Sequence, residues 1–274
     1  MAVMTATRPG VAERENEDWV GAGGEVVVVL DGVSAPGGSP CVHGPAWYVR
    51  RLGPALLTAA ADRDVPLRTV LQRSIEQVNA LHSDCDLASP GTPAAAVGLA
   101  RLEPDVVSTL VLADVTVAAA DREGRVRAVS DDRVASALDP QLREAALALP
   151  FGSPEQRTAL RAMSVDQLAR RNTAGGYWVA AADPHAAREA LVDEHPRDQL
   201  QELALLTDGA AALVDTYNAA TWPGLFDVLR VDGPEAVIDR VRDLEAGDPD
   251  GHRWPRFKPS DDAAVAHIRI DPAC

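Results

Sequence analysis

The residues 25–30 read Glu-Val-Val-Val-Val-Leu, and this run of β-branched residues constrains the fold more than any other part of the sequence. A strand with apolar side chains on both faces must be covered on both faces, so the chain needs a layered fold with this strand inside a sheet. The run stops at Asp31-Gly32, a dipeptide typical of turns. We therefore expect a buried strand that delivers a carboxylate to the edge of a layered structure.

The rest of the chain alternates between helix and strand patterns. Apolar residues recur at three- and four-residue steps in 45–61 and 66–82, and the short link between these segments predicts an antiparallel helix hairpin. Further helices are expected at 139–171 with a break at 150–154, at 184–192, and within 210–245. Strands are expected at 3–7, 19–22, 94–102, 106–113, 115–120, 126–130, 176–182, 203–207 and 263–270. No repeat or linker divides the chain, so we expect one α+β domain over residues 1–274.

Charge and composition exclude several classes of function. The 274 residues carry a net charge of −15, which argues against a nucleic-acid partner, because binding phosphates needs clustered basic residues. No apolar stretch approaches the roughly 20 residues of a membrane span, and no secretion signal is present, so we expect no membrane partner. Three cysteines do not form a disulfide framework at this length, and the cytoplasm is the expected compartment.

Four short acidic elements each adjoin an apolar strand. They are Asn16-Glu17-Asp18, Asp31-Gly32, Asp208-Gly209 and Asp261-Asp262. Any one of them alone is more often a solvated turn than a site. Carboxylates gathered in one place repel one another unless protons or cations lie among them, and hard divalent ions prefer ligand sets made of oxygen.

In their order and spacing these elements resemble the metal-dependent type 2C (PPM) Ser/Thr protein phosphatases, in particular bacterial members of actinobacterial type. The resemblance covers residues 8–270. It implies a sandwich of two antiparallel β-sheets flanked by helix pairs, with two Mn²⁺ or Mg²⁺ ions at one end. The strand and helix order expected from the patterns alone fits that architecture.

The resemblance also implies a set of metal ligands drawn from all four elements: Glu17, Asp18, Asp31, Gly32, Asp208 and Asp261. Asp31 would bridge both ions, and Asp208 and Asp261 would hold the first of them, so these three are the catalytic residues. Glu17 would hold the second ion, with Asp18 acting through water, and the carbonyl of Gly32 would serve one of the two. Asp114 matches the aspartate of a third, weaker site, although its neighbours depart from the family's Gly-Asp-Ser element.

Two basic residues are candidates for binding the substrate phosphate. Bacterial relatives usually carry an arginine four residues before the glutamate of the first motif, where this chain has Glu13 followed by Arg14. A shift of one residue on a strand turns a side chain to the opposite face, so Arg14 would need a bulge to reach the site. The only lysine, Lys258, precedes Asp261 by three residues and could contact a ligand carboxylate or the phosphate, with Arg256 as a substitute. The alternative for Lys258 is a solvated loop residue.

A second group of metal-ligating residues flanks the expected helix hairpin. Cys41 and His43 precede its first helix, and His82 and Cys85 close its second. In an antiparallel hairpin the four side chains could converge, and two thiolates with two imidazoles are a plausible Zn²⁺ set. The spacing matches no standard zinc module, so a Cys41–Cys85 crosslink or close thiol pair, or simple burial, are the alternatives.

The resemblance implies a metal-dependent hydrolase of phosphomonoesters. The default substrate is phosphoserine or phosphothreonine in a protein, attacked by a water that bridges two metals, with no protein nucleophile. Departures from the family pattern at Glu13, Ala113, Val115 and Ala264 leave two alternatives open. One is a catalytically weak or inactive regulatory or binding module, and the other is a phosphatase of small metabolites on the same fold.

Overall fold

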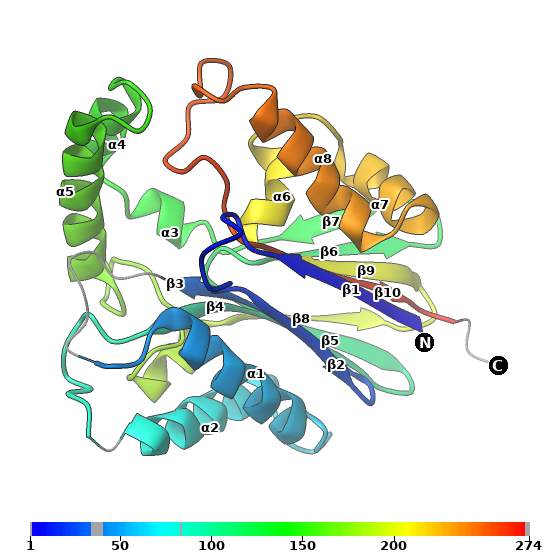
Figure 1. Cartoon of the computed structure of the whole chain (residues 1–274). Helices are drawn as coiled ribbons and strands as arrows, with labels where there is room; N and C mark the ends of the chain where they lie inside the picture. The colour runs from blue at the N-terminus through cyan, green and yellow to red at the C-terminus, as the bar shows by residue number, and fades with distance from the viewer. Residues whose placement is uncertain (1, 34–40, 83, 272–274) are drawn as a thin grey trace.

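The protein is a sandwich of two antiparallel β-sheets with helices on both outer faces, as the computed structural model shows for residues 2–33, 41–82 and 84–271 (Figure 1). One sheet has the order β2 (Trp19–Gly23), β3 (Val26–Val33), β4 (Ala94–Leu102), β5 (Val106–Leu112), β8 (Leu191–Pro196). The other has the order β1 (Ala2–Arg8), β10 (Ala263–Arg269), β9 (Leu200–Leu206), β6 (Thr116–Asp121), β7 (Val126–Val129). The α+β sandwich expected from the sequence is confirmed.

Strand β3 explains why the fold has layers. Val27 and Val29 point into the core between the two sheets, whereas Val26, Val28 and Leu30 point into the core under the helix hairpin. All five are almost completely buried. Alternate residues of one strand thus fill two different cores, which is why an unbroken apolar run is needed.

Helices cover the outer faces unequally. The hairpin of α1 (Pro45–Ala60) and α2 (Leu67–Asn79), extended by η1 (Ala80–His82), covers the sheet that contains β3, and η2 (Pro184–Glu189) packs against α2. The other sheet is covered by α6 (Asp208–Asp215), α7 (Trp222–Val231) and α8 (Pro234–Ala246). Three further helices, α3 (Arg133–Ser136), α4 (Pro140–Leu147) and α5 (Pro154–Arg170), extend from one end of the sandwich (Figure 1). Among the described residues, no helix has the length and apolar character that crossing a bilayer requires.

The structure corrects three local predictions. Residues 176–182 do not form a regular strand, and the bridge of Ala180 to Ala95 is isolated. The helix expected at 184–192 is the short η2, and the chain is already extended at Leu191, where β8 pairs with β5. That pairing is a tertiary interaction along an edge strand, so the local pattern did not show it. Strand β3 also continues through Asp31 and Gly32 to Val33, so the dipeptide is not a turn.

Candidate metal centre

The strand pairings bring the four acidic elements to the same end of the sandwich. Asp31 lies near the end of β3, and because Trp19 pairs with Leu30, the residues just before β2 lie beside it. In the other sheet Val265 pairs with Leu206, so the start of β10 lies beside the end of β9, where Asp208 opens α6. Antiparallel pairing therefore places residues that precede one strand next to residues that follow its neighbour.

Asp18 is the most buried member of the group, with 6% of its surface exposed. Burial raises the pKa of its carboxyl well above the ordinary value, and the charges of Asp208, Asp261 and Asp262 raise it further, against a hydrogen bond from Thr207. Its Oδ2 atom is buried and has no hydrogen-bond partner among the described residues. A buried carboxylate oxygen left unpaired is costly, so the position of this atom suits a bound cation or a proton.

Burial and neighbouring negative charges also raise the pKa values of Asp31 and Asp208. Burial raises the pKa of Asp31 well above the ordinary value, and the charges of Asp18, Asp208 and Asp114 add to it. Loss of solvent around its carboxyl group and the charge of Asp261 raise the pKa of Asp208, although the residue as a whole is exposed.

Asp114 joins this group from the turn between β5 and β6. Burial and the charge of Asp208 raise the pKa of its carboxyl to about 7. The preceding residue, Ala113, has φ 66°, a left-handed conformation that favours glycine. The backbone therefore keeps the turn although alanine stands where the type 2C motif has glycine, and Asp114 is still directed at the cluster.

Two glycines allow the acidic elements to approach closely. A Cβ atom on Gly32 would lie 2.5 Å from the backbone oxygen of Glu17, and one on Gly209 would lie 2.0 Å from the backbone oxygen of Asp262. Both distances are too short for any side chain. The Asp-Gly dipeptides are thus explained by close backbone packing and not by turns.

Gly209→Ala is expected to destabilise the protein by about 1–3 kcal/mol, because the new methyl group must displace the backbone before β10. Urea unfolding measures the change. The matched control is Gly23→Ala, whose Cβ would meet only Leu57 at 3.7 Å. Equal stabilities of the two variants would contradict the close packing described here.

Asp262 is the site residue that the sequence analysis did not assign. Its Oδ1 accepts a hydrogen bond from the Gly10 amide at 2.8 Å, and its Oδ2 accepts one from the Glu17 amide at 2.6 Å. It therefore ties the segment before β2 to the segment before β10. The sequence feature that could have identified Asp262 is its place directly after Asp261 in the fourth acidic element.

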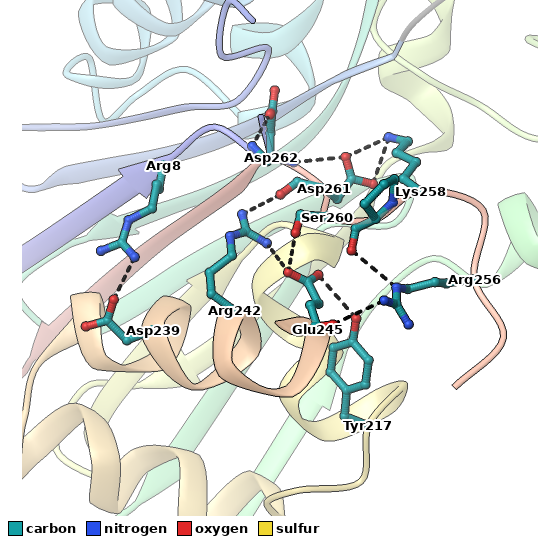
Figure 2. A network of polar contacts seen from close by, with 12 residues as sticks. Arg8, Tyr217, Asp239, Arg242, Glu245, Arg256, Lys258, Ser260, Asp261 and Asp262 are labelled. Carbon is teal, nitrogen blue, oxygen red and sulfur yellow. Dashed lines mark hydrogen bonds and ion pairs between the residues drawn. The ribbon is translucent and has the colours of Figure 1, made fainter. Parts of the chain in front are cut away.

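A polar network from α8 fixes the backbone around Asp261 (Figure 2). Glu245 is buried and accepts hydrogen bonds from Arg242 at 2.8 Å and Ser260 at 2.6 Å, while Arg242 also donates to the carbonyl oxygen of Asp261. Tyr217 donates a further hydrogen bond to Glu245 at 3.2 Å. Helix α8 therefore positions Asp261 through the main-chain carbonyl of Asp261 and not through its carboxylate.

The basic candidates occupy different environments. Lys258 donates to both carboxylate oxygens of Asp261, at 2.6 and 2.8 Å, which matches one of the two contacts considered for it. The side chain is largely exposed, and the charges of Asp261, Asp208 and Asp31 raise the pKa of its ammonium. Arg256 does not substitute for it, because its guanidinium is buried against Asp248 at 3.0 Å and against backbone carbonyls.

Arg14 lies in an exposed turn between β1 and β2, where its amide donates to the carbonyl of Val11. Residues 9–18 are not a strand, so the expected strand phase does not apply to Arg14 and no bulge is needed to redirect its side chain. Glu13 is exposed in the same turn.

Residues 15–242 match the family model described as Protein phosphatase 2C. The chain belongs to the protein phosphatase 2C family. As a member it is a metal-dependent phosphatase, so the family and the enzyme class expected from the sequence are confirmed.

Solved structures of this family share the fold at low sequence identity. The PPM Ser-Thr phosphatase MsPP from Mycobacterium smegmatis, in complex with cacodylate, is 18% identical with a TM-score of 0.55, over 99% of each chain. The phosphatase Stp1 from Staphylococcus aureus is 14% identical with a TM-score of 0.57, over 98% of this chain and 94% of that one. The catalytic domain of PstP in complex with 2 manganese ions is 14% identical with a TM-score of 0.54, over 98% of each chain. No curated protein sequence matches the chain.

Proposed function

We propose that this phosphatase hydrolyses phosphoserine and phosphothreonine in proteins, using two Mn²⁺ or Mg²⁺ ions held by the carboxylate cluster. The observation that carries the proposal is the unpartnered Oδ2 of Asp18, buried among carboxylates that raise one another's pKa. An all-oxygen donor set of this charge suits hard divalent cations. The catalytic domain of PstP, which shares the fold, was solved with 2 manganese ions, and this supports two ions here as well.

The ligand roles follow the position of each residue. Asp31, on which the charges of Asp18, Asp208 and Asp261 act, would bridge the ions. Asp208 and Asp261 would hold the first ion. Glu17 and the carbonyl of Gly32 would serve the second, since Gly32 packs directly on Glu17. Asp18, which is buried, would act through a metal-bound water or as a direct ligand through its unpartnered oxygen.

The two bound ions would lower the pKa of a water between them and so supply hydroxide for in-line attack on phosphorus. Hydrogen bonds from the amides of Gly10 and Glu17 to Asp262, and from Arg242 to the carbonyl of Asp261, would hold the ligand segments in place. Asp114 would support a third, weaker site. Arg14, from its exposed turn, and Lys258, at the rim, are the proposed contacts for the substrate phosphate.

The test is the release of phosphate from peptides that carry phosphoserine, phosphothreonine or phosphotyrosine, and from a panel of phosphorylated metabolites, with Mn²⁺ or Mg²⁺ and with a chelator. We expect metal-dependent release that is fastest with the phosphoserine and phosphothreonine peptides. A preference for metabolites would identify a small-molecule phosphatase instead. Calorimetry that finds one weak Mn²⁺ site and no turnover would identify a regulatory module.

Lys258→Met is expected to tighten Mn²⁺ binding about two- to fivefold, because the ammonium competes with the metal for Asp261 and an exposed ion pair contributes about 0.5–1 kcal/mol. The same variant should weaken inhibition by inorganic phosphate if the ammonium also contacts substrate. Calorimetry and inhibition assays measure the two effects separately. Lys258→Arg keeps the charge and is the control; equal Mn²⁺ affinity in all three proteins would contradict the competition.

We further propose that the chain is a single type 2C domain over residues 1–274, of actinobacterial type, acting in the cytoplasm. The family match and the shared core between the two sheets support the first point. The bias toward arginine, with one lysine among 26 basic residues, supports the second, and the low cysteine count supports the third.

A further inference from the structure

A second cluster of ligand atoms joins the two ends of the α1–α2 hairpin. Cys41 and His43 lie just before α1, while His82 ends η1 and Cys85 follows it. The two Sγ atoms and one nitrogen of each histidine all lie within 4.8 Å of one another. The four side chains therefore converge as the sequence suggested they could, although Cys41 and Cys85 are 44 positions apart in the chain.

The separations match those of a tetrahedral ion site. The Sγ of Cys41 lies 3.4 Å from Nδ1 of His43, 3.4 Å from Nδ1 of His82 and 3.3 Å from the Sγ of Cys85. The Sγ of Cys85 lies 3.5 Å from Nδ1 of His43. Zinc bonds of about 2.3 Å to sulfur and about 2.0–2.1 Å to nitrogen, at tetrahedral angles, place sulfur and nitrogen about 3.5 Å apart and two sulfurs about 3.8 Å apart. The three sulfur–nitrogen distances therefore match, and the two sulfurs would move apart by about 0.5 Å on binding.

The surroundings hold the ligands in place. Cys41 and His82 are buried, with 6% and 3% of their surface exposed, and His43 and Cys85 are half-buried. Trp47 lies on the first turn of α1. The centroid of its ring is 4.0 Å from the ring centroid of His43 and 4.5 Å from that of His82. The Nε2 atom of His82 has no hydrogen-bond partner among the described residues, so its Nδ1 contact and the Trp47 ring orient it.

The chemistry of this cluster differs from that of the carboxylate centre. Two thiols and two imidazoles are softer donors that favour Zn²⁺, whereas oxygen ligands favour Mg²⁺ and Mn²⁺. Four protein ligands also complete a tetrahedron and leave no position for substrate, which is typical of structural zinc sites. Simple burial does not explain why all four chemically active side chains of two chain segments meet at one point.

We propose that Cys41, His43, His82 and Cys85 bind one structural Zn²⁺ ion. The ion would fix the start of α1 to the end of α2. Because Cys41 follows Asp31 by ten residues, it would also anchor the chain soon after it leaves the carboxylate centre. The proposal does not depend on the catalytic assignment, since no ligand is shared between the two centres.

The experiment is zinc analysis by mass spectrometry on protein purified without chelator. We expect about one zinc per chain, because four such ligands bind one ion. Cys41→Ser and Cys85→Ser should lose it, whereas Cys274→Ser, which changes the third cysteine of the sequence, and Asp208→Asn, which changes the carboxylate centre, should keep it. Zinc that is lost with Asp208→Asn and kept in both cysteine variants would overturn the proposal.

Cobalt substitution keeps the test informative if a cysteine variant folds poorly. Protein loaded with Co²⁺ should show the thiolate charge-transfer band and strong visible bands of a tetrahedral cobalt–thiolate site, and Zn²⁺ should displace them. The fluorescence of the hairpin, which contains Trp47, should change in parallel. Absence of the charge-transfer band would overturn the proposal, as would an intact mass two hydrogens lower in protein that holds no zinc, because that mass indicates a Cys41–Cys85 disulfide.

Discussion

Asp208→Asn is expected to lower Mn²⁺-dependent hydrolysis of p-nitrophenyl phosphate roughly a hundred- to a thousandfold, because a lost metal removes several kcal/mol of charge stabilisation from the transition state. Asp31→Asn should have at least the same effect, since Asp31 is the residue proposed to bridge both ions. Steady-state kinetics over a range of Mn²⁺ concentrations measure the loss.

The same substitutions should stabilise the metal-free protein. Removing one charge from a group of carboxylates that repel one another relieves the repulsion that raises their pKa values. Thermal unfolding in a chelator is therefore expected to occur at a higher temperature for Asp208→Asn than for the unchanged protein. The control is Asp239→Asn on α8, whose side chain is exposed and pairs with Arg8 (Figure 2). Full activity in Asp31→Asn or Asp208→Asn would refute the proposed centre.

The metal-free protein is expected to lose stability as the pH rises from about 4 to about 7. The pKa of Asp114 is raised to about 7 in the folded protein, and those of Asp18, Asp31 and Asp208 are also raised. The unfolded chain has aspartate pKa values of about 3.9, so the folded protein binds more protons in this range. The stability from those protons is complete below about pH 4 and is lost as the pH rises through the folded pKa values.

Divalent cations should reverse this loss at neutral pH. A ligand that binds only the folded state adds about 2.7 kcal/mol per site at one hundred times its dissociation constant. For a chain of this size that corresponds to a rise of about 5–10 °C in the unfolding temperature. Scanning calorimetry from pH 4 to 8, with Mn²⁺ and with a chelator, measures both effects. The Asp31→Asn variant should show a weaker dependence on pH and a smaller response to Mn²⁺; an unchanged response would contradict the assignment.

The parts of the fold that follow from local pattern were predictable from the sequence. The valine run of β3 and the apolar spacing of α1 and α2 each depend on residues that are neighbours in the chain. Strand β8 was missed because its pairing with β5 is a long-range contact along an edge. The order of strands in the two sheets could come only from a family resemblance, since no local pattern determines which strands pair.

The candidate centre shows the same division. The acidic motifs identified Asp31, Asp208 and Asp261, because each stands beside an apolar strand. The motifs did not show that Asp262 would bond to the amides of Gly10 and Glu17, since that contact spans about 250 positions of the chain. The prediction for the direction of the Arg14 side chain assumed strand geometry, but residues 9–18 do not form a strand.

The position of β10 has a consequence for the order of biosynthesis. This strand lies between β1 and β9, and the loop before it supplies Asp261 and Asp262. During translation, β1 emerges long before β10, which is its neighbour in the sheet. Asp261 and Asp262 therefore join the other carboxylates only after β10 has been synthesised and inserted between β1 and β9.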